Sequence, residues 1–75
     1  MYEDFDMDYK GERVVLIGDN IAEIYDIGVS SFINIQNITL NSSIKSVSLS
    51  EYYQYLSLCD SSGKIEIYSE VNNSY

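Results

Sequence analysis

The fold of this chain is decided by the stretch from Arg13 to Ile27, which reads RVVLIGDNIAEIYDI. Its first five residues form a short apolar run rich in β-branched side chains, which is typical of a strand. Gly18, Asp19 and Asn20 then interrupt the run, and a second strand-like segment begins at Ile21. Two such segments separated by a short turn cluster predict an antiparallel β-hairpin.

The strand pattern continues through the rest of the chain. We expect further strands over Phe32–Leu40, with a bulge near Gln36–Asn37, and over Lys45–Ser50, Tyr53–Cys59 and Lys64–Val71. The segment from Asp60 to Gly63 predicts a turn, with Asp at its first position and Gly at its last. In the last strand the alternation predicts that Ile65, Ile67 and Val71 face inward and that Glu66, Tyr68 and Glu70 face outward.

Short turns between consecutive strands predict a mainly β fold. We expect a single small antiparallel β-meander of five or six strands over residues 13–71, forming a twisted sheet or a half-barrel. A chain of 75 residues is one domain at most. Residues 1–12 are expected to form a loose acidic N-terminal arm. Residues 72–75 carry almost no packing signal and are expected to be a flexible tail.

Composition excludes several classes of function. With one cysteine and no histidine, the chain can form neither an internal disulfide nor a zinc site. A Ser–His or Cys–His nucleophile cannot be built either, so we expect no enzyme and no cofactor. Asp4, Asp6 and Asp8 have the spacing that opens a calcium loop, but Tyr9 and Val15 occupy the positions of its essential Gly and Glu.

The chain is strongly acidic. Asp and Glu number 12 against 4 Lys and Arg, which gives a net charge of −8. Such a chain is not expected to bind nucleic acid directly, because that needs clustered Lys and Arg. No apolar run reaches the roughly 18–20 residues of a membrane span, and the acidic first residues are unlike a signal peptide. We therefore expect no membrane contact and a cytoplasmic location, which would be the host cytoplasm for a phage-encoded protein.

Three consecutive segments resemble the inner strands of a WD40 β-propeller blade. They are Ile44–Ser50 (IKSVSLS), Tyr55–Asp60 (YLSLCD) and Ser62–Ser69 (SGKIEIYS). Val14 to Ile27 is similar to the last two strands of a preceding blade. The chain has no Gly-His pair, and Tyr68-Ser69 stands where such blades carry Trp-Asp. Because a propeller needs about four to eight blades, the resemblance implies a piece of one, whereas a generic meander would show the same pattern.

Carboxylates and tyrosines are interleaved along the predicted strands. In an extended arm Asp4, Asp6 and Asp8 would form a row about 6.7 Å apart, which can imitate a phosphate backbone. In composition the chain resembles the small acidic inhibitors, anti-CRISPR proteins among them, by which phages block defence nucleases; the same charge would also serve solubility alone. The residues assigned to partner binding are Glu3, Asp4, Asp6, Asp8, Glu23, Tyr25, Asp26, Tyr52, Tyr53, Glu66, Tyr68 and Glu70.

Two functions follow as hypotheses. In the first, the chain is a non-catalytic inhibitor, encoded by a phage or mobile element, that occupies the nucleic-acid-binding surface of a host defence nuclease or effector complex. Its partner would be a larger basic protein. In the second, the chain is a WD40-like structural module that completes a larger protein assembly. Unpaired strands at the margin of a sheet also predict a homodimer formed through an edge strand.

Overall fold

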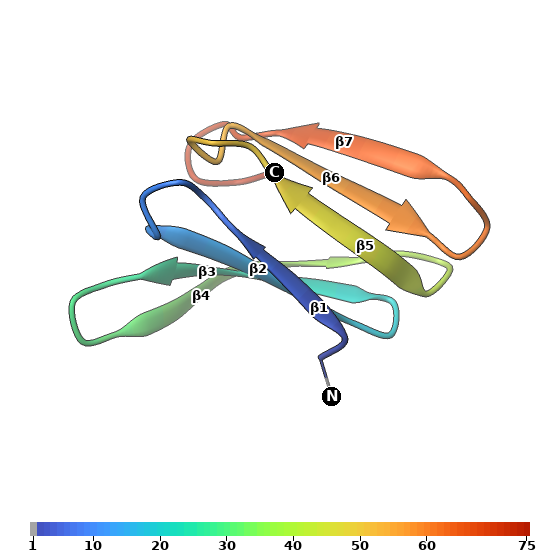
Figure 1. Ribbon diagram of the computed structural model, residues 1–75, viewed down its shortest axis with the longest axis horizontal. Helices are drawn as coiled ribbons and strands as arrows, with labels where there is room; N and C mark the ends of the chain where they lie inside the picture. The colour runs from blue at the N-terminus through green and yellow to red at the C-terminus, as the bar shows by residue number, and fades with distance from the viewer. Residues whose placement is uncertain (1) are drawn as a thin grey trace.

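The computed structural model describes residues 2–75, and every regular element in that range is a β-strand (Figure 1). The strands are β1 (Asp4–Met7), β2 (Arg13–Gly18), β3 (Ile21–Ile27), β4 (Phe32–Thr39), β5 (Ile44–Leu49), β6 (Tyr55–Asp60) and β7 (Ile65–Ser69). They form two antiparallel sheets with the orders β1-β2-β3-β4 and β5-β6-β7. The mainly β, antiparallel fold expected from the sequence is confirmed. It consists of seven strands in two open sheets and is not closed into a barrel.

Tight turns join the strands of each meander. Asp19 and Asn20 form a two-residue loop between β2 and β3, and Asp19 takes the left-handed φ of 56° that such loops require. Between β6 and β7, Gly63 has a φ of 88°. One carboxylate oxygen of Asp60 accepts hydrogen bonds from the backbone N–H groups of Ser62 and Lys64 and from the Ser62 hydroxyl. The Ser62 hydroxyl bond is the main reason that the pKa of Asp60 lies below its ordinary value.

The two sheets pack face to face around one apolar core. Strand β5 begins the smaller sheet and lies against β1 and β2 of the larger one. Two hydrogen bonds secure this contact, from Ile44 N to Asp19 O (2.7 Å) and from Leu49 N to a carboxylate oxygen of Asp6 (2.7 Å). The buried core consists of Val15, Ile17, Ala22, Ile24, Ile44, Leu49, Leu56 and Leu58.

Both chain ends are more ordered than the sequence predicts. Strand β1 lies within the expected loose arm, yet it pairs with β2 from Asp4 opposite Ile17 to Met7 opposite Val14. The expected flexible tail folds back through a Val71–Ser74 bridge. The backbone of Tyr75 then makes two hydrogen bonds with the side chain of Gln36, which tie the tail to β4. Long-range backbone pairing of this kind leaves no local signal in a sequence.

Strand β7 has the opposite orientation from the one predicted. Tyr68 lies opposite Leu56 and Glu66 opposite Leu58, so both share the core-facing side of the sheet. Ile65 and Ile67 are instead 64% and 72% exposed, and Val71 is also exposed. Ile65 and Ile67 occupy one phase of the strand and Tyr68 the other, so either phase buries at least one large side chain. The register in which β7 pairs with β6 decides which of these side chains face the core. The predicted bulge in β4 is present, one residue earlier than expected, at Ile35.

Candidate protein-binding surface

The three carboxylates of the expected acidic row, at positions 4, 6 and 8, all accept hydrogen bonds within the chain, Asp4 only from the adjacent Phe5 N–H. Asp8 is 5% exposed, and one of its oxygens accepts the backbone N–H groups of Glu12 and Arg13, each at 2.8 Å. Asp6 accepts from the backbone of Met7 and, across the sheets, from Leu49. Only Asp4 is exposed. The structure therefore replaces a row of three free carboxylates with one surface carboxylate and two that hold the fold together.

Two more of the predicted binding residues belong to a network around Arg13, which is 1% exposed. Its Nε donates to Asp26 at 2.9 Å, and its guanidinium carbon lies 4.1 Å from the centre of the Tyr53 ring. The two terminal nitrogens donate to the Tyr75 hydroxyl and the Asn73 side chain, each at 3.2 Å. Asp26 and Tyr53 are thus engaged in holding the C-terminal segment against the larger sheet.

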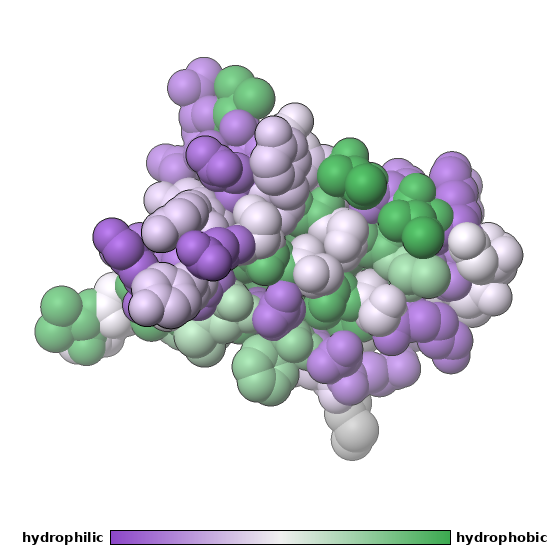
Figure 2. Space-filling model, turned by 45° about the horizontal axis from the view of Figure 1, so that its top comes forward, coloured by the Kyte–Doolittle hydropathy of each residue, from purple (hydrophilic) through white to green (hydrophobic). Residues whose placement is uncertain are grey.

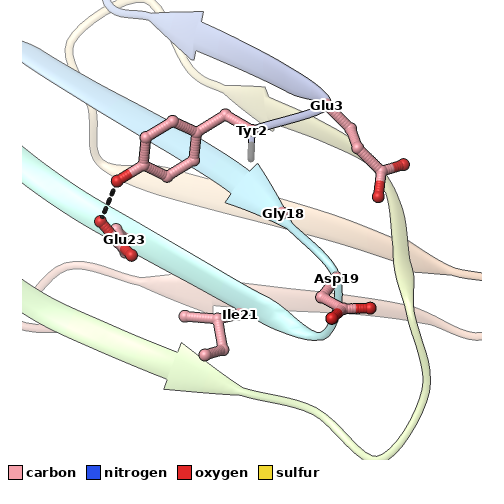
Figure 3. A pocket seen from close by; sticks show the side chains of 6 residues that line it. All are labelled: Tyr2, Glu3, Gly18, Asp19, Ile21 and Glu23. Carbon is pink, nitrogen blue, oxygen red and sulfur yellow. Dashed lines mark hydrogen bonds between the residues drawn. The ribbon is translucent and has the colours of Figure 1, made fainter.

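Glu23 and Tyr25 lie on the outer face of the larger sheet. One oxygen of Glu23 accepts hydrogen bonds from the hydroxyls of Tyr2 (2.6 Å) and Tyr25 (2.7 Å). These two bonds lower the pKa of Glu23, the Tyr2 bond most, and the Glu23 bond raises the pKa of Tyr25. Beside them is an open hollow of about 590 Å³, which Figure 3 shows between β3 and the N-terminal segment. It is lined by Tyr2, Glu3, Gly18, Asp19, Ile21 and Glu23.

The hydrogen bonds to Glu23 predict a small loss of stability in acid. A carboxyl group with a lowered folded-state pKa stabilises the fold above its unfolded pKa of about 4.3. That contribution disappears as pH falls through the folded pKa. We expect Glu23→Gln to cost less than about 1 kcal/mol near neutral pH, since the pair is partly exposed, and to cost less still at low pH. Urea unfolding of wild type and variant between about pH 7 and pH 3 measures this difference.

The exposed Glu51→Gln variant is the control for that titration. As a substitution of an exposed side chain, it should change stability by no more than about 0.5 kcal/mol at neutral pH. If the cost of Glu23→Gln did not shrink in acid, the two tyrosine bonds would contribute nothing to stability.

The remaining predicted residues lie on or near the smaller sheet. The Tyr68 hydroxyl donates to Glu66 at 2.7 Å, and burial, with this bond, raises the pKa of Tyr68 to about 12. Glu66 also lies 3.7 Å from the Lys64 ammonium, and Glu70 accepts the backbone N–H of Asn73. Tyr52 is exposed. Of the twelve predicted residues, only Glu3, Asp4 and Tyr52 are exposed rather than partly or fully buried, and the structure does not gather all twelve on one face.

The sequence interpretation missed a set of exposed apolar side chains on the outer faces of both sheets. Phe5, Met7 and Phe32 are 59%, 43% and 55% exposed on the larger sheet. On the smaller sheet Ile65 and Ile67 form a second apolar stripe. Figure 2 shows hydrophobic side chains along β7. The alternation Asp-Phe-Asp-Met in β1 carried the signal for Phe5 and Met7, since it places them on the side of the strand opposite to Asp4 and Asp6.

Comparison with known proteins finds no match for this chain among family models, curated proteins or solved structures. No helix within residues 2–75 has the length and apolar content that crossing a membrane requires. Over the same residues, no group of three or more His, Cys, Asp or Glu side chains is placed to hold a metal ion. The function of the chain therefore has to be argued from its surfaces.

Proposed function

We propose that this chain is a non-catalytic structural β module, similar to two neighbouring propeller blades, that completes a larger protein assembly. The observation that carries the proposal is that each sheet has one buried face and a second, outer face with exposed apolar side chains. Repeated sheets that cannot bury both faces alone gain stability when a neighbouring unit stacks on them. The outer faces are accordingly proposed as contact surfaces for neighbouring units.

The outer face of the larger sheet is the stronger case. Its register aligns Phe5 with Leu16 and Met7 with Val14, and Val14 in turn with Tyr25. The Tyr25 ring stacks on Phe32 with 4.9 Å between ring centres. An apolar strip thus crosses the sheet from β1 to β4, with Val14 buried at its centre and Phe5, Met7 and Phe32 exposed at its ends. Large exposed apolar patches on a small domain are typical of protein–protein contacts.

The order of the strands also supports the proposal. A four-stranded meander is followed by a second meander, and the two sheets stack with their first strands, β1 and β5, close together. Two consecutive blades around a propeller axis would require the same order. The smaller sheet has three strands within the described residues, so a further strand could extend it at β7.

The test is the size and salt resistance of the native complex. In a lysate of the source cells, the tagged chain should migrate in a large complex that survives about 1 M salt, because salt does not weaken apolar contacts. The double variant Phe5→Ser, Met7→Ser should leave this complex. Val29→Ser, which changes a fully exposed loop residue, should remain in it. A wild-type chain that migrates alone, or a double variant that stays in the complex, would contradict the proposal.

A second candidate is the acidic inhibitor of a nucleic-acid-binding protein. It is favoured by the hollow lined by the carboxylates of Glu3, Asp19 and Glu23, with no basic side chain in its lining. Charge steering predicts that binding to a basic partner weakens as salt rises from about 0.05 to 0.5 M. Glu3→Gln with Asp4→Asn should weaken it too, whereas Phe5→Ser with Met7→Ser should not. A complex unaffected by salt and by the first pair of substitutions argues against this candidate.

A further inference from the structure

Strand β7 is an edge of the smaller sheet and has no strand on its far side within residues 2–75 (Figure 1). Its pairing with β6 runs from Cys59–Ile65 to Tyr55–Ser69 without a register shift. The exposed side chains of Ile65 and Ile67 stand on its outer face. A regular, apolar, unpaired edge is a template for pairing with a strand of another chain.

The edge of the larger sheet at β4 is less suited to such pairing. A bulge at Ile35 interrupts the pairing of β4 with β3, where the register shifts between Ile24 and Tyr25 of β3. The amide of Asn34 also donates to the carbonyl of Gln36 and to the side chain of Asn37. Bulges and local side-chain bonds of this kind are common devices that protect an edge. The pairing surface is therefore β7.

The hydrogen-bond phase of β7 restricts the possible register. Asp60 N donates to Lys64 O, and Glu70 N donates to Gln54 O, so the even-numbered residues of β7 bond to β6. In an antiparallel ladder these residues alternate with residues that direct their N–H and C=O groups away. Ile65, Ile67 and Ser69 thus offer their backbone groups to an incoming strand.

We propose that two copies of this chain pair through β7 in an antiparallel, two-fold arrangement centred on Ile67. The proposal rests on the proposed function as an assembly module and names the partner at this edge. A centre on Glu66 would set Glu66 against Glu66 of the partner subunit, and a centre on Tyr68 would set Glu66 against Glu70 of the partner subunit, so both registers oppose like charges. A centre on Ile65 or Ser69 would leave half of each strand unpaired. The register centred on Ile67 uses the whole strand and joins the two smaller sheets into one of six strands.

Side-chain chemistry agrees with this register. It sets Ile67 against Ile67 of the partner subunit and Ile65 against Ser69 of the partner subunit on the outer face. On the other face it sets Lys64 against Glu70 of the partner subunit, and the two-fold axis repeats this opposite-charge pair. The Lys64 side chain is 68% exposed and makes only a 3.7 Å contact with Glu66 within its own chain, so it can turn to a partner. Cross-strand pairs of opposite charge favour a register.

The net charge of each copy opposes the pairing at long range. Two chains of −8 each repel, and salt screens this repulsion over about 10 Å at 0.1 M. We therefore expect dimerisation to strengthen between about 0.05 and 0.5 M salt. This dependence has the opposite sign from the one expected for an acidic inhibitor on a basic partner.

Disulfide cross-linking tests the register directly. In a Cys59→Ser background, Ile67→Cys should give a cross-linked dimer under mild oxidation, because aligned residues lie about 5.5 Å apart between Cα atoms, within reach of a disulfide. Ile65→Cys is the matched control. It stands on the same face of the same strand, but its two copies would be offset by about 13 Å. We expect at least about ten times more cross-linked dimer from Ile67→Cys, since disulfide geometry excludes the longer separation.

Charge exchange provides a second, independent readout. In sedimentation equilibrium Lys64→Glu and Glu70→Lys should each weaken the dimer several-fold, and the double exchange should restore it, because the opposite-charge pair is then re-formed. A wild-type chain that stays monomeric at about 1 mM, so that any dimer has a Kd weaker than about 1 mM, would overturn the proposal. Equal cross-linking at both positions, or no restoration by the double exchange, would also overturn it. The assembly function, tested at Phe5 and Met7, would survive that failure.

Discussion

Replacing Leu58 with Ala should lower the free energy of unfolding by about 3 kcal/mol. Leu58 is fully buried on β6, in the core between the two sheets. The substitution removes apolar contacts and leaves a cavity that the opposing sheet can only partly fill. For a domain of 75 residues, total stability is expected to be about 4–11 kcal/mol. The change therefore removes a large fraction of it.

Equilibrium urea unfolding followed by far-UV circular dichroism measures this loss. Val29→Ala removes the same class of side chain from the loop between β3 and β4, where it is fully exposed. That control should change stability by no more than about 0.5 kcal/mol. A Leu58→Ala variant that loses less than about 1 kcal/mol would mean that the two sheets do not share a closely packed core.

The second large effect is expected from Arg13→Met, which keeps most of the side-chain volume and removes the charge. We expect a loss of about 2–4 kcal/mol, since removing one member of a buried ion pair leaves the other uncompensated. This expected loss lies toward the lower part of the range of about 3–5 kcal/mol that is usual for breaking a buried ion pair, because the Asp26 side chain is 42% exposed and partly solvated. The variant also loses the contact with the Tyr53 ring and the bonds that hold Asn73 and Tyr75.

Two further variants separate charge from geometry in this network. Arg13→Lys keeps the charge but has no planar fork, so it should recover only part of the lost stability. Lys10→Met removes an exposed cation close by in sequence and should be nearly neutral. Amide hydrogen exchange of residues 72–75 gives an independent readout. It should accelerate in Arg13→Met if the guanidinium anchors the tail, and unchanged protection would contradict that anchoring role.

Local sequence was sufficient to predict the strands and their turns. The apolar run before Gly18 and the Asp-Ser-Ser-Gly segment at residues 60–63 carry short-range signals, and both turns form where they were predicted. The antiparallel order of neighbouring strands follows from such short connections. Strand β1 was missed because three aspartates within five residues, at positions 4, 6 and 8, are typical of a solvated segment.

The residues assigned to binding show why a surface is harder to predict than a strand. Sequence alone cannot tell an exposed carboxylate from one that accepts backbone hydrogen bonds. Asp8 and Asp4 have the same chemistry and similar neighbours in the sequence, yet one is buried against the backbone of Arg13 and the other faces solvent. The partner of each is set by contacts from distant parts of the chain. The Tyr53 ring likewise packs against the guanidinium of Arg13, a residue 40 positions away in the sequence.

By itself, then, the sequence determined the all-β class, the antiparallel meander order, the principal turns and the net charge of −8. Each of these depends on composition or on residues within a few positions of one another. The tertiary structure alone decided the division into two sheets, the docking of the tail on Arg13, and the side of β7 that faces the core. Each of these depends on which distant segments pack together. When large side chains stand on both faces of a strand, as in β7, the buried face is the one that another sheet covers.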